Sequence, residues 1–469
     1  MLINRVAILD NGIYKKQSDV LVINKIIKNN VVTEWTDADS LLMCEHGTFC
    51  SLIIKKYIEV VSFYGIRILD ENGKGDYATL YQAFNECNKK KICLLNLSFG
   101  TTHFQDKKVI RKTINHFSNQ GLLIIAATSN DGYTTFPASL SNVISVSAGE
   151  SFGIDRDMQF QKGIDFIAPS DHEITLEGTS FCLGKSNSYA APYVTAMVGN
   201  LINEKGMLTI DEIRSTLAPE GTVYIYSPDW IEKAWISPEY MKKDAKFYFD
   251  VDERNLQQCM DDIDTLVLCT RSEMEKYEDL EKHIVYLGSD DIRPAGNRHH
   301  FWNMEMRGEQ IRSSKGKADE IDIPVIWCIF YSETDIIKFL CGLKKMFADE
   351  GYNAFTGCPL VDSPLYDLEY MPCDLDLNDN LEDFIYWQTY YQQSDLVLIG
   401  TIYGEFGLQF LGDAIDMVVD FKHLDDYLLV GVYIDGYAPI ENTYSLKDKN
   451  AIREIFHFIV KSFDKEEDE

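Results

Sequence analysis

The chain has 469 residues, of which 45% are hydrophobic and 25% are charged, proportions typical of a globular rather than a disordered protein. This length exceeds that of one ordinary domain and favours two or three. The formal net charge is −30, from 74 acidic and 44 basic residues. Such a surface disfavours binding to nucleic acid and to anionic membranes. It favours a basic peptide partner, although solubility alone would also account for it.

The N-terminal text, MLINRVAILDNG, lacks the charged and apolar regions of a secretory signal, and no apolar run reaches the ~18 residues that span a bilayer. The 11 cysteines form no C-x-x-C pair, and the nine histidines do not cluster with them at zinc spacing. Cys44 and Cys50 are interpreted as small apolar fillers, with redox or metal inhibition of a nearby site as the alternative. These features predict a cytoplasmic protein with reduced thiols, no structural metal and no cofactor.

Short apolar strands alternate with helical patterns over the first 200 residues. The expected strands are 6–10, 65–70, 92–98, 122–128 and 143–149, and the expected helices are 46–60, 76–88, 106–119 and 187–203. Strands with almost no polar residues, alternating with helices, indicate a parallel sheet covered on both faces. We therefore predict a doubly wound α/β domain over residues 1–205.

The pattern changes after residue 205. A connector is expected over 206–244, with a helix at 209–217, followed by a small α/β subdomain over 245–320. That subdomain should contain strands at 246–251, 265–270 and 283–289 and an exposed polar loop at 291–320. Residues 321–469 predict a further α/β domain, Rossmann-like or P-loop-like. Its expected strands are 323–331, 395–401 and 427–434, its expected helices are 336–351 and 448–463, and an acidic tail ends it.

Four polar residues stand at strand ends or helix starts of the first domain. Asp10 ends the strand in VAILDNGI, and His46 opens an apolar helix in EHGTFCSLI. Asn130 follows the strand in LLIIAATSNDG, and Ser188 begins the helix in SNSYAAPYVTAMVG. Because the carboxyl ends of parallel strands share one edge of a sheet, we expect these side chains to meet there.

These residue types suit nucleophilic attack on a carbonyl. A serine hydroxyl is a weak nucleophile, so Ser188 needs a base, and a histidine such as His46 can take its proton near neutral pH. A carboxylate such as Asp10 would fix the histidine tautomer and stabilise the imidazolium. The Asn130 amide and the Ser188 backbone N–H, at a helix start, would hold the oxyanion.

The order Asp10, His46, Ser188, with the motifs LDNG, HGT and SYAAPYV, resembles the subtilase family of serine proteases over about residues 4–203. FPAS (136–139) and DFIAPS (165–170) resemble two further segments of that family. LSFG (97–100) resembles its substrate-pairing segment, which implies that Ser98, Phe99 and Gly100 bind a peptide in extended, strand-adding form. The resemblance implies a subtilisin-like fold, endopeptidase activity and the roles given above.

The motifs depart from the family in four places. Asn11 replaces its Ser or Thr, Ser186 replaces its Gly two residues before the nucleophile, and Asn187 replaces its Thr. Thr128-Ser129-Asn130 replaces its Ala-Gly-Asn. A second candidate, Ser180 in GTS, lacks the Ala-x-Pro continuation, so Ser188 is the predicted nucleophile. None of these departures removes a catalytic group, and activity is expected. The alternative is an inactive scaffold that uses the same fold to hold a peptide.

The C-terminal half contains the layout strand, loop, Lys338, helix that a phosphate-binding loop would have. Tyr331, Glu333 and Ile337 stand where such a loop needs glycines, so nucleotide binding through Lys338 is not favoured. Residues 245–460 resemble degenerate P-loop-like proteins of clostridial peptide-maturation clusters, in TGCPLVDSPLY (356–366) and DLVLIGTIYGEFG (395–407).

That second resemblance implies a role in maturing a ribosomally made peptide, with the protease removing its leader. The C-terminal half would then bind the precursor, join a maturation-enzyme complex or hold a homodimer together; a plain structural domain shielding the cleft is the alternative. The sequence as a whole predicts an intracellular, subtilisin-like serine endopeptidase of narrow specificity. Acidic residues near its cleft would select Lys or Arg in the substrate.

Overall fold

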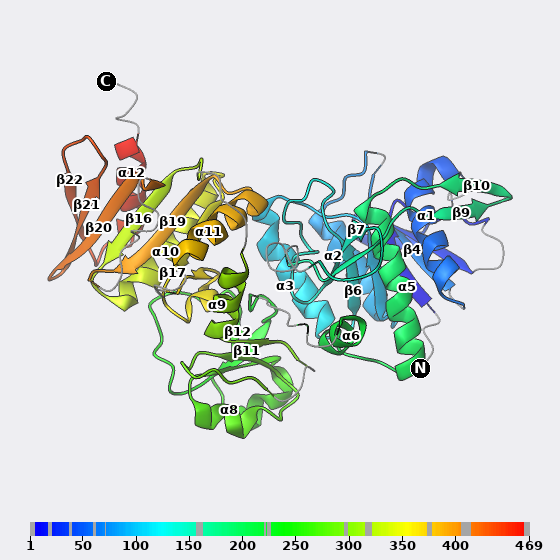
Figure 1. Cartoon of the computed structure of the whole chain (residues 1–469), viewed down its shortest axis with the longest axis horizontal. Coiled ribbons are helices and arrows are strands. Elements are labelled where there is room, and N and C mark those ends of the chain that lie inside the picture. The colour runs from blue at the N-terminus through cyan, green and yellow to red at the C-terminus, as the bar shows by residue number, and fades with distance from the viewer. Residues whose placement is uncertain are drawn as a thin grey trace. The chain divides into compact units, whose positions relative to one another are not determined.

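The computed structural model describes residues 5–16, 21–36, 40–59, 62–70, 72–155, 163–219, 222, 227–294, 299–314, 321–372, 378–404 and 414–463. The chain divides into two compact units (Figure 1). The first comprises Met1–Glu232 with Leu280–His283 and Pro294–His300, and the second comprises the remaining residues. Among the described residues, no helix combines the length and the apolar character needed to cross a membrane.

An eight-stranded sheet forms the centre of the first unit, in the order β3-β2-β4-β1-β5-β6-β7-β8. Its strands are β1 (Arg5–Asp10), β2 (Val22–Lys28), β3 (Val31–Glu34), β4 (Ser62–Arg67), β5 (Leu94–Leu97), β6 (Leu123–Ala127), β7 (Ile144–Gly149) and β8 (Phe166–Pro169). Neighbouring strands are parallel except in the β2–β3 hairpin. The carboxyl ends of the parallel strands therefore lie along one edge.

Helices cover both faces of this sheet (Figure 1). Val6 and Ile8 of β1 pack in one core with α1 (Leu41–Tyr57) and α5 (Asn187–Lys205). Ala7 and Leu9 pack in the other with α2 (Tyr77–Lys89) and α3 (Lys107–Ser118). Successive residues of a strand point to opposite faces, so a strand buried on both sides must be apolar throughout. The predicted doubly wound α/β architecture is confirmed.

Several elements of the first unit differ from the expectation. Helix α1 begins at Leu41 rather than at residue 46, with a kink at Cys44 (φ −141°, ψ 27°). The hairpins β2–β3 and β9–β10 (Glu173–Leu176 and Thr179–Cys182) were not expected. Their strands carry exposed polar residues and give no continuous apolar signal. Helix α6 (Ile210–Leu217) matches the expected helix and begins with a capping box between Thr209 and Glu212.

The second unit begins with a five-stranded sheet in the order β12-β11-β13-β14-β15. These strands are β11 (Lys233–Ile236), β12 (Asp250–Val251), β13 (Thr265–Leu268), β14 (His283–Tyr286) and β15 (Phe301–Trp302), with α7 (Leu256–Cys259) and α8 (Arg271–Tyr277) between them. The expected strand 246–251 is reduced to its last two residues. The expected polar loop was wrong in part: it contains β15 and α9 (Met304–Ser313), which buries Met306 and Ile311 and is capped by Asn303.

A seven-stranded sheet completes the second unit, in the order β18-β17-β19-β16-β20-β21-β22. Its strands are β16 (Val325–Phe330), β17 (Ala354–Cys358), β18 (Glu369–Tyr370), β19 (Leu396–Ile402), β20 (Met417–Leu424), β21 (Tyr427–Tyr433) and β22 (Ile440–Ser445). The strands from β18 to β20 are parallel, and β20-β21-β22 form an antiparallel meander. The helices are α10 (Glu333–Asp349), α11 (Asn378–Gln392) and α12 (Ala451–Phe463).

A buried arginine, Arg214, joins α6 to the segments that lead into β7 and β8 of the central sheet. Arg214 donates from Nε and Nη2 to the two carboxylate oxygens of Asp165, at 3.0 and 2.9 Å. Nη1 donates to the backbone carbonyl of Ser141, and Nη2 donates also to that of Val143. A buried ion pair with this many hydrogen bonds stabilises the fold only while both partners are present. Removing one partner would leave the other as an uncompensated buried charge.

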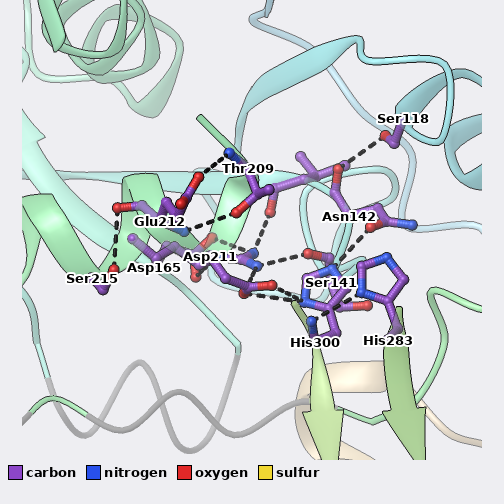
Figure 2. Close-up of polar contacts among 12 residues, drawn as sticks. Ser118, Ser141, Asn142, Asp165, Thr209, Asp211, Glu212, Ser215, His283 and His300 are labelled. Atoms are coloured by element: carbon purple, nitrogen blue, oxygen red, sulfur yellow. Dashed lines mark hydrogen bonds and ion pairs between the residues drawn. The ribbon is translucent and has the colours of Figure 1, made fainter. Parts of the chain in front are cut away.

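His300 extends this network through both of its ring nitrogens (Figure 2). The Asn142 amide donates from Nδ2 to Asn115 and to the Trp230 carbonyl, so its Oδ1 is the acceptor that faces His300 Nε2 at 2.9 Å. The other nitrogen, Nδ1, lies 3.1 Å from Asp211 Oδ1. Both neighbours accept, so both nitrogens must donate, and the imidazolium is the form that fits.

The charges of this buried group then balance, with Arg214 and His300 facing Asp165 and Asp211. Burial acts to raise the pKa of Asp211, but His300 and Arg214 outweigh it and lower that pKa from 3.8 to about 2. A carboxyl with a depressed pKa stabilises the fold fully above its ordinary value. That contribution is lost as the pH falls through about 2.

His300→Gln tests this assignment. The amide can still bond Asn142 but removes one of the two cations that face Asp211, so we expect the free energy of unfolding at pH 7 to fall by about 3 kcal/mol. Urea unfolding measures the loss, with His103→Gln as the matched control at an exposed position. Equal stability of the two variants would show that His300 is neutral in the folded protein.

Candidate active site

Asp10 and His46 form a close pair at the carboxyl edge of the first sheet. Asp10 is the last residue of β1 and is fully buried, while His46 projects from α1 just after the kink. His46 Nδ1 lies 2.7 Å from Asp10 Oδ2, and the other carboxylate oxygen accepts the backbone N–H of Asn11 at 2.7 Å. The carboxylate therefore fixes the imidazole with Nδ1–H toward Asp10 and leaves Nε2 available to take a proton.

The motif residues around this pair allow α1 to approach β1 closely. A Cβ on Gly47 would lie 2.3 Å from the Gly12 carbonyl oxygen, so only glycine fits beside His46. The Asn11 side chain accepts the Gly47 backbone N–H at 3.1 Å. Asn11, which departs from the family motif, thus fastens the start of the helix to the end of the strand.

Ser188 lies in the first turn of α5 and is joined to the end of β5. Its Oγ donates to the Ser98 carbonyl at 3.1 Å, and the Ser98 hydroxyl donates back to the Ser188 carbonyl at 2.9 Å. Asn96 donates to the Ser98 hydroxyl from within the sheet. The Ser188 hydroxyl thus bonds Ser98 rather than His46, and it must rotate to reach the imidazole.

Asn130 follows β6, and its side chain is held against the start of α5. Its Oδ1 accepts the Asn187 backbone N–H at 2.9 Å. Because one end of the planar amide is fixed by an N–H donor, the other end, Nδ2, is a donor directed away from that bond. This is the orientation that an oxyanion donor requires.

The Asn187 side chain was noted in the sequence only as a departure, and it proves to hold this corner together. It is buried and donates to the carbonyls of Thr128 and Ser129, at 3.2 and 2.8 Å. Its Oδ1 accepts the Ala148 backbone N–H at 2.8 Å. Asn187 therefore joins the ends of β6 and β7 to the residue that precedes Ser188.

Ser186, where the family motif has Gly, caps α5 in an unexpected way. Its hydroxyl accepts the Ser188 backbone N–H at 3.3 Å. That N–H was the predicted second oxyanion donor. In this structure it is already occupied by a side chain that a glycine would not have.

The predicted substrate segment, Ser98–Gly100, leads from β5 into a bridge between Thr101 and Phe136. Phe99 is half-buried and Gly100 is exposed. A Cβ on Gly100 would lie 2.3 Å from the Thr135 methyl group, so glycine is required for the two segments to pass each other. A separate hollow of about 490 Å³ borders the Asp10–His46 pair. It is lined by Asp10, Asn11, Leu42, Met43, His46, Arg67, Leu69, Asp70 and Gly73.

Two groups of described residues bring metal-ligand types together. Asp10, His46 and Cys50 form the first, but burial raises the pKa of the Cys50 thiol well above its usual value, and that thiol points to Ser98 and Ser188. This environment suits a packed thiol rather than a thiolate ligand.

Asp211, His283 and His300 form the second group. The His300 backbone N–H donates to His283 Nδ1 at 2.9 Å, and the two rings stack with their centroids 4.7 Å apart. Stacked rings with engaged nitrogens do not converge on one ion, so this group fits the ion-pair network described above.

Two residues named in the sequence lie outside this constellation. Ser180 lies in β10 and is exposed. Lys338 lies within α10, and its Nζ is 2.7 Å from Asp244 Oδ2. The turn before that helix, Tyr331 and Ser332, has no glycine to wrap a phosphate.

The electrostatics around His46 favour its charged form. Burial acts to lower the pKa of His46, but the charge and hydrogen bond of Asp10, with a smaller contribution from Glu45, raise it above 6.5. Burial raises the pKa of Tyr189, whose ring lies 5.5 Å from the His46 ring, to about 12, so this tyrosine stays neutral. Asp10 therefore favours a proton on His46, as a general base of this kind requires.

Comparison with known proteins agrees with this geometry. Residues 5–220 match the model of the subtilase family. The minor extracellular protease Epr of Bacillus subtilis (strain 168) is 30% identical over 173 residues, which are 34% of this chain and 26% of Epr. Thermitase of Thermoactinomyces vulgaris is 24% identical over 218 residues, 43% of this chain and 75% of thermitase. The chain therefore spans about a quarter of the length of Epr.

A solved structure described as a lanthipeptide protease is 17% identical to this chain, with a TM-score of 0.37. The match covers 45% of this chain and 78% of that one. The family match falls within the first unit, which contains Asp10, His46 and Ser188.

Asp10→Asn should lower the pKa of His46. The substitution removes the carboxylate charge that raises this pKa and leaves the burial that lowers it, so the titration midpoint should move from above 6.5 to below it. NMR titration of the imidazole C–H resonances measures the shift, with His46→Gln assigning the signal and Asp106→Asn as a control at a distant position. An unchanged midpoint would contradict the Asp10–His46 pairing.

Proposed function

We propose, from the subtilase domain that residues 5–220 form, that this protein is a serine endopeptidase with Ser188 as nucleophile, His46 as general base and Asp10 as the residue that orients His46. The observation that carries the proposal is the buried Asp10–His46 pair, 2.7 Å apart. The start of α5 carries Ser188 next to the Asn130 amide, and this supports the assignment of the nucleophile and the oxyanion donor.

The reaction follows from this arrangement. The Ser188 hydroxyl leaves the Ser98 carbonyl, gives its proton to His46 Nε2 and attacks the substrate carbonyl carbon. Asp10 stabilises the resulting imidazolium, which then protonates the leaving amine. Asn130 Nδ2 donates to the developing oxyanion, and loss of such a donor costs about 3–4 kcal/mol of barrier. Water then hydrolyses the acyl-enzyme by the same path, with His46 again acting as base.

We further propose a restricted processing role, removal of the leader from a ribosomally made, modified peptide in the cytoplasm. Two features support it. The chain carries a second unit of more than 200 residues, whose sequence resembles peptide-maturation proteins. Its net charge of −30 suits a basic precursor. The substrate would bind in extended form along Ser98, Phe99 and Gly100.

The second candidate is a peptide-binding scaffold without catalysis. The observation that favours it is the bonding of Ser188, whose hydroxyl donates to Ser98 and whose backbone N–H donates to Ser186. Both groups are occupied in a resting site. Catalytic hydrogen bonds often tighten only when substrate binds, so we favour the enzyme.

A fluorophosphonate probe separates the two candidates. It phosphonylates a serine that an adjacent base activates, so the wild type should be labelled and Ser188→Ala should not. Ser180→Ala, which removes the exposed serine of β10, should be labelled like the wild type. Intact-mass spectrometry counts the adducts. A folded wild type that takes up no label would leave the scaffold as the better hypothesis.

Ser186→Gly should increase the rate of hydrolysis. It removes the hydroxyl that occupies the Ser188 N–H, and Gly at an N-cap costs only a few tenths of a kcal/mol, so α5 stays in place. We expect kcat to rise about fivefold with KM unchanged, which corresponds to about 1 kcal/mol for one hydrogen bond that no longer has to break. Ser186→Thr keeps the acceptor and serves as the control. A fall in kcat for Ser186→Gly would mean that the hydroxyl assists the reaction.

A further inference from the structure

The second unit has an aromatic surface at the place where a phosphate-binding loop was considered. Tyr331 follows β16 and Tyr403 follows β19, and these two strands are parallel neighbours. The two rings stack with centroids 4.8 Å apart and an interplanar angle of 21°. Both remain exposed, Tyr403 by 64%. Their stack covers the strand ends that would otherwise face a phosphate.

Carboxylates extend this surface across the meander. Asp420 of β20 lies directly opposite Gly431 of β21, which lies opposite Glu441 of β22. Directly opposed residues share a face of the sheet. Since Gly431 has no side chain, the ring of Tyr433 folds over it, 3.0 Å from where a Cβ would be. We call these five residues the tyrosine–carboxylate patch: Tyr331, Tyr403, Tyr433, Asp420 and Glu441.

The patch has unbalanced negative charge. Tyr331 donates a long hydrogen bond of 3.4 Å to Asp420 Oδ2, and Asp420 Oδ1 is buried without a hydrogen-bond partner among the described residues. Burial raises the pKa of Asp420, and the neighbouring Glu441 adds to the rise. Burial also raises the pKa values of Tyr331 and Tyr433, with Asp420 adding to both.

Lys422 is the cation that acts on this group from the described residues, and it only partly offsets the charge. It lies two residues after Asp420 on the same strand, is exposed, and lowers the pKa of Asp420 less than burial raises it. The other charges nearby belong to carboxylates. A cation placed between the tyrosine rings and Asp420 would therefore gain both cation–π and ionic stabilisation.

We propose that the tyrosine–carboxylate patch binds a lysine or arginine side chain of a basic peptide segment, and that this is a docking site separate from Ser188. Stacked, exposed tyrosine rings attract an ammonium or guanidinium group through their faces, and Asp420 and Glu441 supply the counter-charge. The same carboxylates repel a phosphate. This end of the sheet therefore selects a cationic ligand, whereas a nucleotide site would select an anionic one. The site lies within the second unit and needs no catalytic residue.

Isothermal titration with two peptides tests this site, using the full chain with Ser188→Ala so that nothing is cleaved. Acetyl-(Gly-Lys)4-amide should bind, and acetyl-(Gly-Gln)4-amide of the same length should not. Tyr403→Ala and Asp420→Asn should each raise the Kd for the lysine peptide at least fivefold. Tyr403 is exposed, so its removal leaves the core intact.

Matched controls separate the patch from the acidic surface in general. Tyr352→Ala removes another exposed tyrosine outside the patch, and Asp425→Asn removes a carboxylate from the β20–β21 turn. Both should bind the lysine peptide within twofold of the parent. Equal Kd values for patch and control variants, or no binding at millimolar peptide, would overturn the proposal. Because the parent is already inactive at Ser188, either result is independent of whether the first unit is a protease.

Discussion

The start of helix α5 must be fixed against the ends of β5, β6 and β7, and the rest of the site depends on that constraint. Ser188 is useful only at one position relative to His46 and Asn130, and a helix start by itself leaves free N–H groups and no fixed partners. Ser98 bonds Ser188 from β5, and Asn187 bonds the carbonyls after β6 and an N–H of β7. These bonds fix the position of Ser188 relative to Asn130, and they engage neither the Ser188 hydroxyl nor the Asn130 amide.

The residues that depart from the family motif take part in that same constraint. Asn11 reaches the start of α1, and Asn187 reaches two strands, which a threonine side chain with one hydroxyl would not do. Ser186 adds a contact of a different kind, because it bonds the Ser188 N–H, the group proposed as the second oxyanion donor. These three departures are therefore not neutral drift at the edge of the site. Two of them stiffen it, and the third makes its resting state differ from its working state.

Local patterns in the sequence were enough to predict most of the fold of the first unit. The apolar strands predicted the sheet, since β1 buries both of its faces and leaves no polar alternation. Asp10 and Asn130 could be picked out because the one ends and the other follows an apolar strand, and His46 because an apolar helical segment follows it. The link between His300 and Asp211 joins residues far apart in sequence, and no local pattern signals it. Helix α9 was missed because its text, MEMRGEQIRS, buries few apolar side chains.

The two units treat charged side chains in different ways. Where opposite charges are buried in the first unit they are matched, with Arg214 and His300 facing Asp165 and Asp211, as the cost of an unpaired buried ion requires. On the surface the excess is acidic, and in the tyrosine–carboxylate patch Lys422 only partly offsets the charge of Asp420. A protein with a charge of −30 gains little from one more exposed carboxylate for solubility. A carboxylate held beside stacked tyrosines is instead selective, because the rings add directional attraction that a dispersed acidic surface lacks. In a phosphate-binding protein, a glycine-rich loop at these strand ends binds an anion. Here the strand ends bear tyrosines and carboxylates, which suit a cationic side chain of a basic peptide.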